Sequence, residues 1–350
     1  MAGRGGMKLL LDCDNAFPAP VADADDALAL ALALALPEIE PVGVAACAGN
    51  CPAGASADNS RRLLDLAGRP DIPVAVGRDR PLAADRSAHH AYLDAKSAGP
   101  GRAYWDGIEP PERPGPSGPG LAAHDLIIQE ALNAPGALDL ALTGSLTNLA
   151  MALQAAPEIA GKIGQAVHMG GAIAGQDCAF VTPDIPDAVW RDVLRFNTLY
   201  DPHASAAVLQ SELALTFVPA NLTSRIFLRP RSLEPLEREA SAFGRFILAG
   251  ARAWLLFSME KRRLPGAQMH DPAALAALAR PEWFVFEPMR VDLARLFAGD
   301  NAFLVREGEG PKVRVAVDAD VRSVEAWIAN GLARAAAAPA GCRDRAKKEG

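Results

Sequence analysis

The chain lacks an excess of positive charge. Its 350 residues include 35 Lys and Arg against 42 Asp and Glu, which gives a formal net charge of −7. An acidic surface does not attract a nucleic-acid backbone or an anionic membrane. We therefore expect neither as a partner and predict a small-molecule ligand instead.

Long apolar runs and paired cysteines are also missing. The Ala/Leu run of residues 27–36 is far shorter than the roughly 18 residues of a membrane span. The first ten residues, MAGRGGMKLL, contain no hydrophobic core followed by a cleavage site, so no secretion signal is expected. The five cysteines are odd in number and lack C-x-x-C spacing, which fits a reduced compartment. These absences predict a cytoplasmic protein.

Common ligand-binding fingerprints are absent as well. Neither G-x-G-x-x-G nor G-x-x-x-x-G-K-[ST] occurs, so no dinucleotide or P-loop site is predicted. A calcium EF-hand counted from Asp12 fails, because Phe17 stands where glycine is required and Asp23 where glutamate is required. A strand ending in D-x-D also occurs in phosphatases of the haloacid dehalogenase type. Those continue with x-Thr or x-Val, whereas this chain has Asn15-Ala16, which disfavours that alternative.

What is present is a regular alternation of strand-like and helix-like segments. Half of the residues are hydrophobic, which is enough for a large core. The alternation predicts an α/β fold with an open, mainly parallel Rossmann-like sheet and helices on both faces. We assign residues 8–335 to one such domain, between flexible termini at 1–7 and 336–350. Residues 77–120 lose all periodicity and are expected to form a long loop, either a partly ordered lid or a surface insertion. Strands are expected near residues 9–11, 39–46, 72–76, 137–142, 163–169, 214–218, 284–293 and 313–317.

The junction between the first strand and the first helix is unusually acidic. Residues 12–26 contain five aspartates, namely Asp12, Asp14, Asp23, Asp25 and Asp26. Like charges at this density repel, so a site that keeps them ionised needs a cation, and carboxylate oxygens suit calcium or magnesium. Asp25 or Asp26 can alternatively be a helix cap. Caps do not explain the whole cluster, so we favour a metal site.

Other polar residues fall at the ends of predicted elements. Asn50, Thr143 and Gly170-Gly171 follow strands, and His270-Asp271 begins a late helix. In open parallel sheets, ligands bind beyond the carboxyl ends of the strands. Taken singly, Asn50 is more often a turn residue, and His270 is more often a packed histidine at a helix start. Together they predict a site at one edge of the sheet.

As a set, these motifs resemble the inosine/uridine-preferring nucleoside hydrolase family. The matching pieces are DCD with DDALAL, VGVAACAGN, LTGSLTNLA, VHMGG, FNTLYDPHAS and MHDPAALAAL, in the order in which the family has them. The resemblance implies hydrolysis of the N-glycosidic bond of ribonucleosides, with Ca²⁺ as the cofactor. It also implies a homodimer or homotetramer.

The resemblance assigns roles to individual residues. It implies that Asp14 is both a calcium ligand and the general base for the attacking water. The further calcium ligands would be Asp26, Asp271 and the backbone carbonyl of Thr143. Sugar binding would fall to Asp25, Asn50 and Asn197, and His270 would be the acid that helps the base to leave.

Two departures from the family pattern affect the expected chemistry. Ten residues, 15–24, separate Asp14 from Asp25 where relatives have three, and Asp23 within them could replace a metal ligand or lie over the metal. Arg195 stands where relatives commonly have glutamate. A guanidinium suits a phosphate or carboxylate, so an anionic riboside such as a nucleoside 5′-phosphate is an alternative substrate. A surface arginine paired with Asp192 is the competing interpretation.

The remaining candidates are less specific. The glycine-rich HG motif of the family is missing, and His89-His90 is its nearest counterpart. Trp254 and Phe257 lie on a predicted amphipathic helix at residues 239–263, where they either cover the base or form core. A catalytically silent metal- and riboside-binding protein also remains an alternative.

Overall fold

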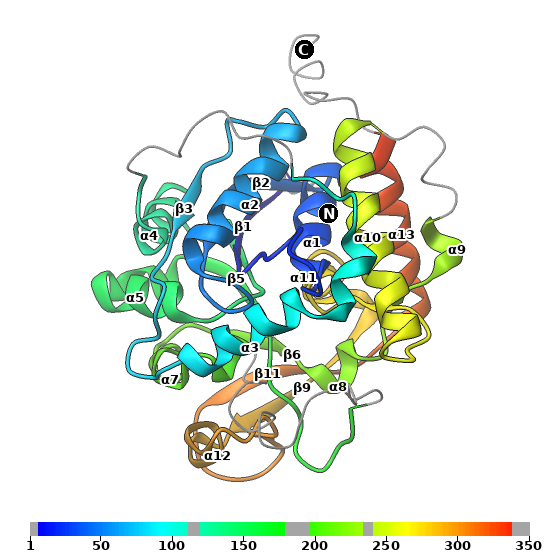
Figure 1. Cartoon of the computed structure of the whole chain (residues 1–350). Helices are drawn as coiled ribbons and strands as arrows, with labels where there is room; N and C mark the ends of the chain where they lie inside the picture. The colour runs from blue at the N-terminus through cyan, green and yellow to red at the C-terminus, as the bar shows by residue number, and fades with distance from the viewer. Residues whose placement is uncertain (1–5, 111–119, 179–196, 234–240, 338–350) are drawn as a thin grey trace.

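The computed structural model describes residues 6–110, 120–178, 197–233 and 241–337 (Figure 1). Nine strands in these residues form one sheet, in the order β10-β9-β11-β6-β5-β4-β1-β2-β3. Strands β1 to β6 and β11 are parallel to their neighbours, whereas β9 pairs antiparallel with β11 and β10 antiparallel with β9. The strands are β1 (Met7–Cys13), β2 (Ile39–Ala46), β3 (Val74–Val76), β4 (Leu138–Leu142), β5 (Ile163–Met169), β6 (Leu215–Val218), β9 (Phe284–Val291), β10 (Leu304–Val305) and β11 (Lys312–Ala319). The predicted mainly parallel sheet is confirmed.

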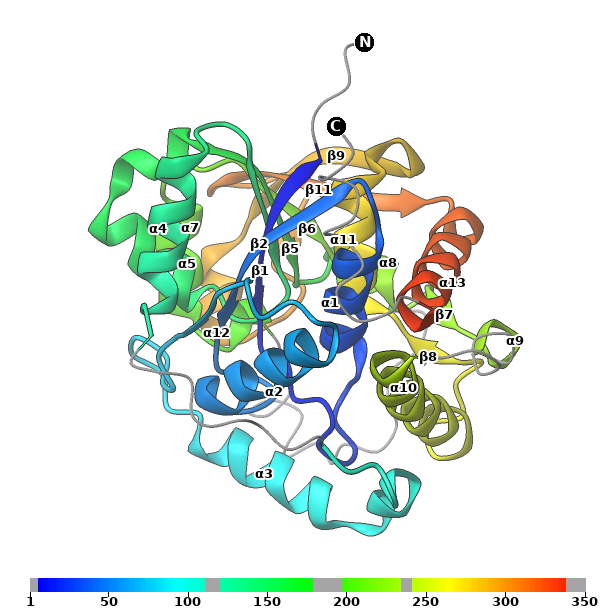
Figure 2. The same cartoon turned by 90° about the horizontal axis from the view of Figure 1, so that it is seen from above.

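Helices cover both faces of this sheet (Figures 1 and 2). One hydrophobic cluster holds α1 (Asp25–Ala35), α2 (Ala53–Leu66), α10 (Ala242–Glu260), α11 (His270–Ala279) and α13 (Val321–Ala337). A second cluster, on the other face, holds α4 (Ala123–Asn133), α5 (Thr147–Ala155), α7 (Pro202–Leu209) and α12 (Leu293–Ala298). Shorter elements are η2 (Pro157–Gly161), η3 (Asn197–Leu199), α8 (Ala220–Thr223), α9 (Pro230–Leu233), η5 (Pro281–Trp283) and the hairpin of β7 (Phe227–Leu228) with β8 (Ala267–Gln268).

Helix α1 connects the acidic junction to the core. Its Ala/Leu sequence has high helix propensity, and residues 25–33 are all buried. The N-cap is Ala24, which makes no side-chain capping bond. The interpretation of Asp25 or Asp26 as the cap is therefore wrong: they are the first two helical residues. There the positive end of the helix dipole favours a carboxylate.

The prediction of a long loop over residues 77–120 is wrong for residues 87–105, whereas residues 111–119 lie outside the described residues. This stretch contains α3 (Ser87–Ala98) and the 3₁₀ helix η1 (Pro100–Trp105). Helix α3 has only one fully buried residue, His89, so its sequence shows little apolar periodicity. In η1, Trp105 packs against Trp254 and Phe257 of α10, which fixes the segment against the core.

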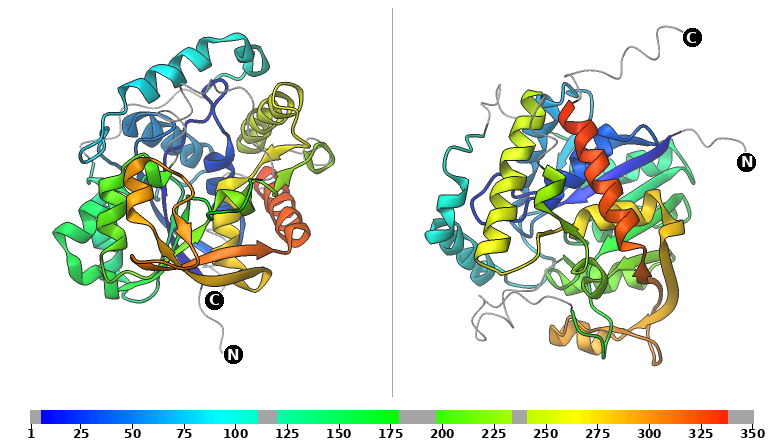
Figure 3. Two further views of the ribbon diagram at one scale, coloured as in Figure 1. Left: turned by 90° about the horizontal axis from the view of Figure 1, so that it is seen from below. Right: turned by 90° about the vertical axis from the view of Figure 1, so that its right-hand side faces the viewer.

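Among the described helices, α10 alone is long and apolar enough to cross a membrane by length and composition. Most of that stretch is buried inside the protein, against α13 on one side and η1 on another (Figure 3). We therefore assign α10 to the core of the α/β domain.

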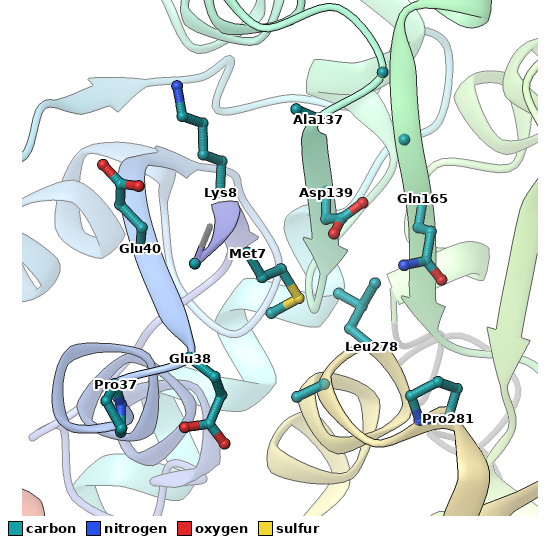
Figure 4. Close-up of a pocket in the computed structure, with 14 residues that line it drawn as sticks. Met7, Lys8, Pro37, Glu38, Glu40, Ala137, Asp139, Gln165, Leu278 and Pro281 are labelled. Atoms are coloured by element: carbon teal, nitrogen blue, oxygen red, sulfur yellow. The ribbon is translucent and has the colours of Figure 1, made fainter. Parts of the chain in front are cut away.

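The two edges of the sheet differ. A hollow of about 800 Å³ lies at the amino edge, where β1, β2, β4 and β5 begin (Figure 4). Its lining includes Lys8, Glu40, Asp139 and Gln165, and none of the candidate site residues. The candidate residues lie instead at the carboxyl edge, where the same strands end.

Candidate active site

The end of β1 supplies two buried carboxylates. Asp12 and Asp14 are 1% and 2% exposed. Asp12 Oδ1 accepts a hydrogen bond from Asn148 Nδ2 at 3.0 Å. Asp14 Oδ2 accepts one from the backbone N–H of Asn50 at 2.7 Å, and Asn50 Nδ2 lies 3.5 Å from Asp14 Oδ1. The chain after β2 thus orients the Asp14 carboxylate.

The first turn of α1 adds two more. Asp25 Oδ2 accepts from the backbone N–H groups of His270 and Asp271, at 3.2 and 3.3 Å. Asp26 Oδ1 accepts from the hydroxyl of Thr143 at 2.8 Å. The structure therefore brings the starts of α1 and α11 together with the end of β4.

Burial dominates the electrostatics of these carboxyl groups. It raises the pKa of Asp12 to about 7, of Asp14 to about 6 and of Asp25 to about 8. The pKa values of Asp26 and Asp271 are raised well above the usual range by burial and then by the neighbouring carboxylates. The carboxyl groups of Asp14, Asp26 and Asp271 lie close enough to change one another's pKa. Keeping all of them ionised at neutral pH requires a compensating cation.

The donor set fits an oxygen-liganded divalent cation. Asp14, Asp26 and Asp271 offer carboxylate oxygens, and Thr143 offers a carbonyl that accepts a hydrogen bond from Asn197 Nδ2 at 2.8 Å. In the described part of the chain, no three His, Cys, Asp or Glu side chains are already gathered as a metal centre. The fit therefore rests on the chemistry and pairwise contacts of the aspartates, which suit a hard cation such as calcium or magnesium.

Asn197 contacts this cluster through the Thr143 carbonyl. It is 7% exposed, and its Nδ2 also donates to the carbonyl of Met169 at 2.9 Å. The side chain thereby links the ends of β4 and β5 and orients the Thr143 carbonyl. The other predicted sugar-side residue of this segment, Arg195, falls outside the described residues.

His270 is the first residue of α11. Its Nδ1 lies 2.7 Å from the hydroxyl of Thr223, which holds the ring. Burial lowers the His270 pKa to about 4; the negative charge of Asp23 opposes this shift and the positive charge of Arg262 adds to it. The ring is therefore neutral at pH 7, and any help it gives to a leaving group comes from a neutral imidazole N–H.

The sequence left two interpretations of Trp254 open, a cover for the base or a core residue. Trp254 is 2% exposed and stacks on Phe257, with ring centres 5.9 Å apart. The structure thus supports the core alternative for Trp254.

Two histidines of α3 make polar contacts with other segments. His89 Nε2 is 3.0 Å from the Gly49 carbonyl, and His90 Nε2 is 2.9 Å from the Tyr200 hydroxyl. The His89 contact ties α3 to the loop that carries Asn50, and the His90 contact ties it to the residue that follows η3.

Comparison with known proteins decides the family. The family model described as "Inosine-uridine preferring nucleoside hydrolase" matches residues 9–326. The chain belongs to that family. The resemblance read from the motifs is confirmed, and membership makes this nucleoside hydrolase an N-glycosidic-bond hydrolase. The family is metal-dependent, in agreement with the acidic cluster.

Curated relatives cover most of the chain. An uncharacterized protein of Schizosaccharomyces pombe is 31% identical over 82% of this nucleoside hydrolase and 84% of its own length. The pyrimidine-specific ribonucleoside hydrolase RihA of Klebsiella pneumoniae is 30% identical over 79% and 81%. The non-specific ribonucleoside hydrolase RihC of Escherichia coli is 30% identical over 89% and 95%. Relatives of equal similarity thus differ in specificity.

Solved structures support the fold. The purine-preferring ribonucleoside hydrolase from Gardnerella vaginalis superposes with a TM-score of 0.75 at 24% identity, covering 95% of this nucleoside hydrolase and all of that chain. A plant nucleoside hydrolase gives a TM-score of 0.70 at 22% identity, covering 93% and 98%.

Three residues at the site escaped sequence analysis. The Thr223 hydroxyl contacts the His270 ring, and Asn148 donates a hydrogen bond to Asp12. The positive charge of Arg262 lowers the pKa of His270. Asn148 lies within the recognised LTGSLTNLA motif, which was a usable signal. Thr223 and Arg262 carry no such signal, because only the fold brings them to the site.

Proposed function

We propose that this nucleoside hydrolase is a calcium-dependent ribonucleosidase that releases ribose and a free base. The observation that carries the proposal is the set of buried aspartates, Asp14, Asp25, Asp26 and Asp271, gathered at the carboxyl edge of the sheet. Such a set suits both a hard cation and a substrate that gains positive charge on its sugar.

Asp14 is the proposed proton acceptor for the attacking water. It is buried, and the backbone N–H of Asn50 fixes one of its oxygens at 2.7 Å. Asp14, Asp26, Asp271 and the Thr143 carbonyl would hold the cation. A bound divalent cation supplies Lewis acidity, which makes water a better nucleophile at neutral pH.

Sugar binding falls to residues beside this centre. Asp25 and Asn50 lie next to Asp14 and Asp271, and their oxygens suit ribose hydroxyls. As the glycosidic bond breaks, the ribose gains oxocarbenium character, and the surrounding carboxylates stabilise that charge. His270, whose ring contacts the Thr223 hydroxyl, would donate a hydrogen bond to the departing base.

A reducing-sugar assay tests the proposal. Purine and pyrimidine ribonucleosides and their 5′-monophosphates are incubated with the protein, with and without a calcium chelator. We expect ribose release that the chelator abolishes and that added Ca²⁺ restores. A protein that retains calcium in elemental analysis but releases no ribose would support a silent binding protein instead. Faster hydrolysis of the monophosphates than of the free nucleosides would favour the anionic riboside and a role for Arg195.

The first variant to test is Asp14→Asn. Removal of the proton acceptor and of one ligand charge should lower kcat by roughly a thousandfold or more and weaken calcium binding. The control is Asp125→Asn on the exposed start of α4, which should leave both unchanged. Wild-type turnover by Asp14→Asn would remove Asp14 from the mechanism.

A further inference from the structure

Residues 49 and 50 share one peptide group, and its two ends contact two different side chains. Its N–H, on Asn50, donates to Asp14 Oδ2 at 2.7 Å. Its carbonyl, on Gly49, lies 3.0 Å from Nε2 of His89. A carbonyl oxygen only accepts hydrogen bonds, so Nε2 of His89 carries the hydrogen and donates it. A chain of hydrogen bonds thus runs from α3 through this peptide group to the Asp14 carboxylate.

The peptide group lies close against that carboxylate. A Cβ added at Gly49 would overlap Asp14 Oδ2, so only glycine permits this approach. The distance of 2.7 Å from the Asn50 nitrogen to Asp14 Oδ2 is at the short end of the range for such bonds, as is typical of a charged acceptor. The Cys51 carbonyl accepts from the Gly49 N–H at 3.1 Å, which folds the loop at this point. Rotation of the peptide group would therefore break its contact with Asp14.

His89 approaches this peptide group from an anchored helix. It is 2% exposed, and its ring packs edge-on against Tyr200, with ring centres 5.7 Å apart. Arg86, the N-cap residue of α3, donates from its guanidinium to the carbonyl of Tyr200 at 2.7 Å and to that of Leu199 at 2.6 Å. This pair of hydrogen bonds fixes the start of α3, three residues before His89.

The contact with His89 acts on Asp14 in two ways. It fixes the rotation of the peptide group of residues 49 and 50, which sets the direction of the N–H. A hydrogen bond to an amide carbonyl also polarises the amide, so its N–H becomes a stronger donor. Removal of a partner that orients a metal ligand in this way typically costs roughly ten- to hundredfold in metal affinity or activity.

We propose that His89 is a positioning residue for Asp14, which acts through the peptide group of residues 49 and 50. By holding the Asp14 carboxylate in one orientation, it prepares Asp14 to bind calcium and to accept the proton of the attacking water. This inference rests on the proposed function. It places His89 on the side of the metal and the water, away from the departing base.

Substitutions at residue 89 test the proposal by rescue. His89→Gln keeps an N–H donor at a reach similar to that of Nε2, whereas His89→Leu removes the donor. We expect His89→Leu to lower kcat on uridine and inosine by about tenfold, with KM less affected. The loss should extend to 4-nitrophenyl β-D-ribofuranoside, because its nitrophenolate needs little help to leave but the water still needs a proton acceptor. His89→Gln should recover most of the rate on all three substrates.

Calcium binding provides a readout that does not depend on turnover. Titration calorimetry of the chelator-treated protein should show a dissociation constant raised by about tenfold in His89→Leu and close to the wild-type value in His89→Gln. The matched control is His90→Leu, which removes the contact of α3 with the Tyr200 hydroxyl and leaves the chain to Asp14 intact. It should leave kcat and calcium affinity unchanged.

Three outcomes would overturn the inference and leave the proposed function intact: wild-type kcat and calcium affinity in His89→Leu, a loss confined to the two nucleosides, or an equal loss in His89→Gln or His90→Leu. If His89→Leu does not fold, His89→Asn replaces it, because the shorter amide cannot reach the Gly49 carbonyl. A wild-type protein that binds calcium but hydrolyses none of the substrates would overturn the proposed function, and the calcium titrations would then decide the role of His89. A protein that binds no calcium would overturn both.

Discussion

At the scale of single residues, each carboxylate of the site has a different partner. Asp12 is held by an asparagine side chain, Asp14 by a backbone N–H, Asp25 by the start of α11 and Asp26 by a threonine hydroxyl. A buried carboxylate without a hydrogen bond is costly, so these partners are needed for the cluster to exist in a folded protein. They also give each acid a fixed direction, which is what distinct chemical roles require.

The residue-scale prediction concerns Thr223, which positions His270. In Thr223→Val the hydroxyl is replaced by a methyl of similar size, so the imidazole loses its 2.7 Å contact and its orientation. We expect kcat on uridine and inosine to fall by about tenfold, with calcium affinity unchanged. Steady-state kinetics and calcium titration measure both.

Thr223→Ser is the matching control, because it keeps the hydroxyl. It should recover most of the lost rate. If the serine variant is as slow as the valine variant, the hydroxyl does not position His270.

The sequence predicted the acids of the site more completely than their partners. Asp14, Asp26 and Asp271 stand in motifs with a fixed order, whereas Thr223 and Arg262 reach the site only through tertiary packing. Trp254 shows the limit of helical spacing, because an aromatic residue at that spacing can face either a ligand or the core. Only the packing of η1 against α10 decides between them.

At the scale of elements, buried parallel strands were the easiest to predict. The bounds of β2 and β5 match the predicted residues 39–46 and 163–169, because each strand has a mostly apolar second half and is followed by Cys47 or Gly170. Helix α3 could not be predicted, since its stability comes from polar contacts of His89 and His90 rather than from an apolar stripe.

The lengthened segment of residues 15–24 is docked on its surroundings. The Phe17 ring centre lies 5.0 Å from that of Phe246, and the ring rests against Gly250, where an added Cβ would overlap it. The hydroxyl of Ser97 donates to the Pro20 carbonyl at 2.9 Å. These contacts fix the segment that carries Asp23 between α1, α10 and α3.

The element-scale prediction is that Gly250→Ala will impair activity. Helix propensity alone would make this change stabilising by about 1 kcal/mol. The clash with Phe17 should instead destabilise the protein by about 1–3 kcal/mol and displace the acidic segment. We expect a lower melting temperature and a kcat reduced on every substrate, the nitrophenyl riboside included.

A second helical glycine provides the comparison. An added Cβ on Gly54 of α2 meets nothing within 4 Å, so Gly54→Ala should leave both stability and rate intact or slightly raise stability. Full activity in Gly250→Ala would show that the position of Phe17 does not matter for catalysis.

At the scale of the whole molecule, the buried carboxyl groups make stability depend on pH and on the metal. Burial raises the pKa of Asp12 to about 7 and of Asp25 to about 8, whereas both ionise near pH 4 in an unfolded chain. Below about pH 6.5 the buried His168 and the half-buried His270, with pKa values lowered to about 4, act in the opposite direction. Above it, the folded state binds more protons than the unfolded state, so stability falls as pH rises.

We therefore expect the melting temperature of the chelated protein to decrease between about pH 6.5 and 8.5. Calcium binds the ionised carboxylates, so it should raise the melting temperature more at pH 8.5 than at pH 6.5. Differential scanning calorimetry with chelator and with excess Ca²⁺ measures both effects. A chelated protein that is more stable at pH 8.5 than at pH 6.5 would contradict the assignment of the aspartates as buried and unpaired with a cation.

The hydrogen bonds of Asp25 also have a consequence for biosynthesis. Their donors, the backbone N–H groups at the start of α11, lie 245 and 246 residues further along the chain. A ribosome makes the acidic junction early and α11 late, so the nascent junction remains hydrated until residue 271 has emerged and folded back. Catalysis can therefore begin only after most of the polypeptide has been translated.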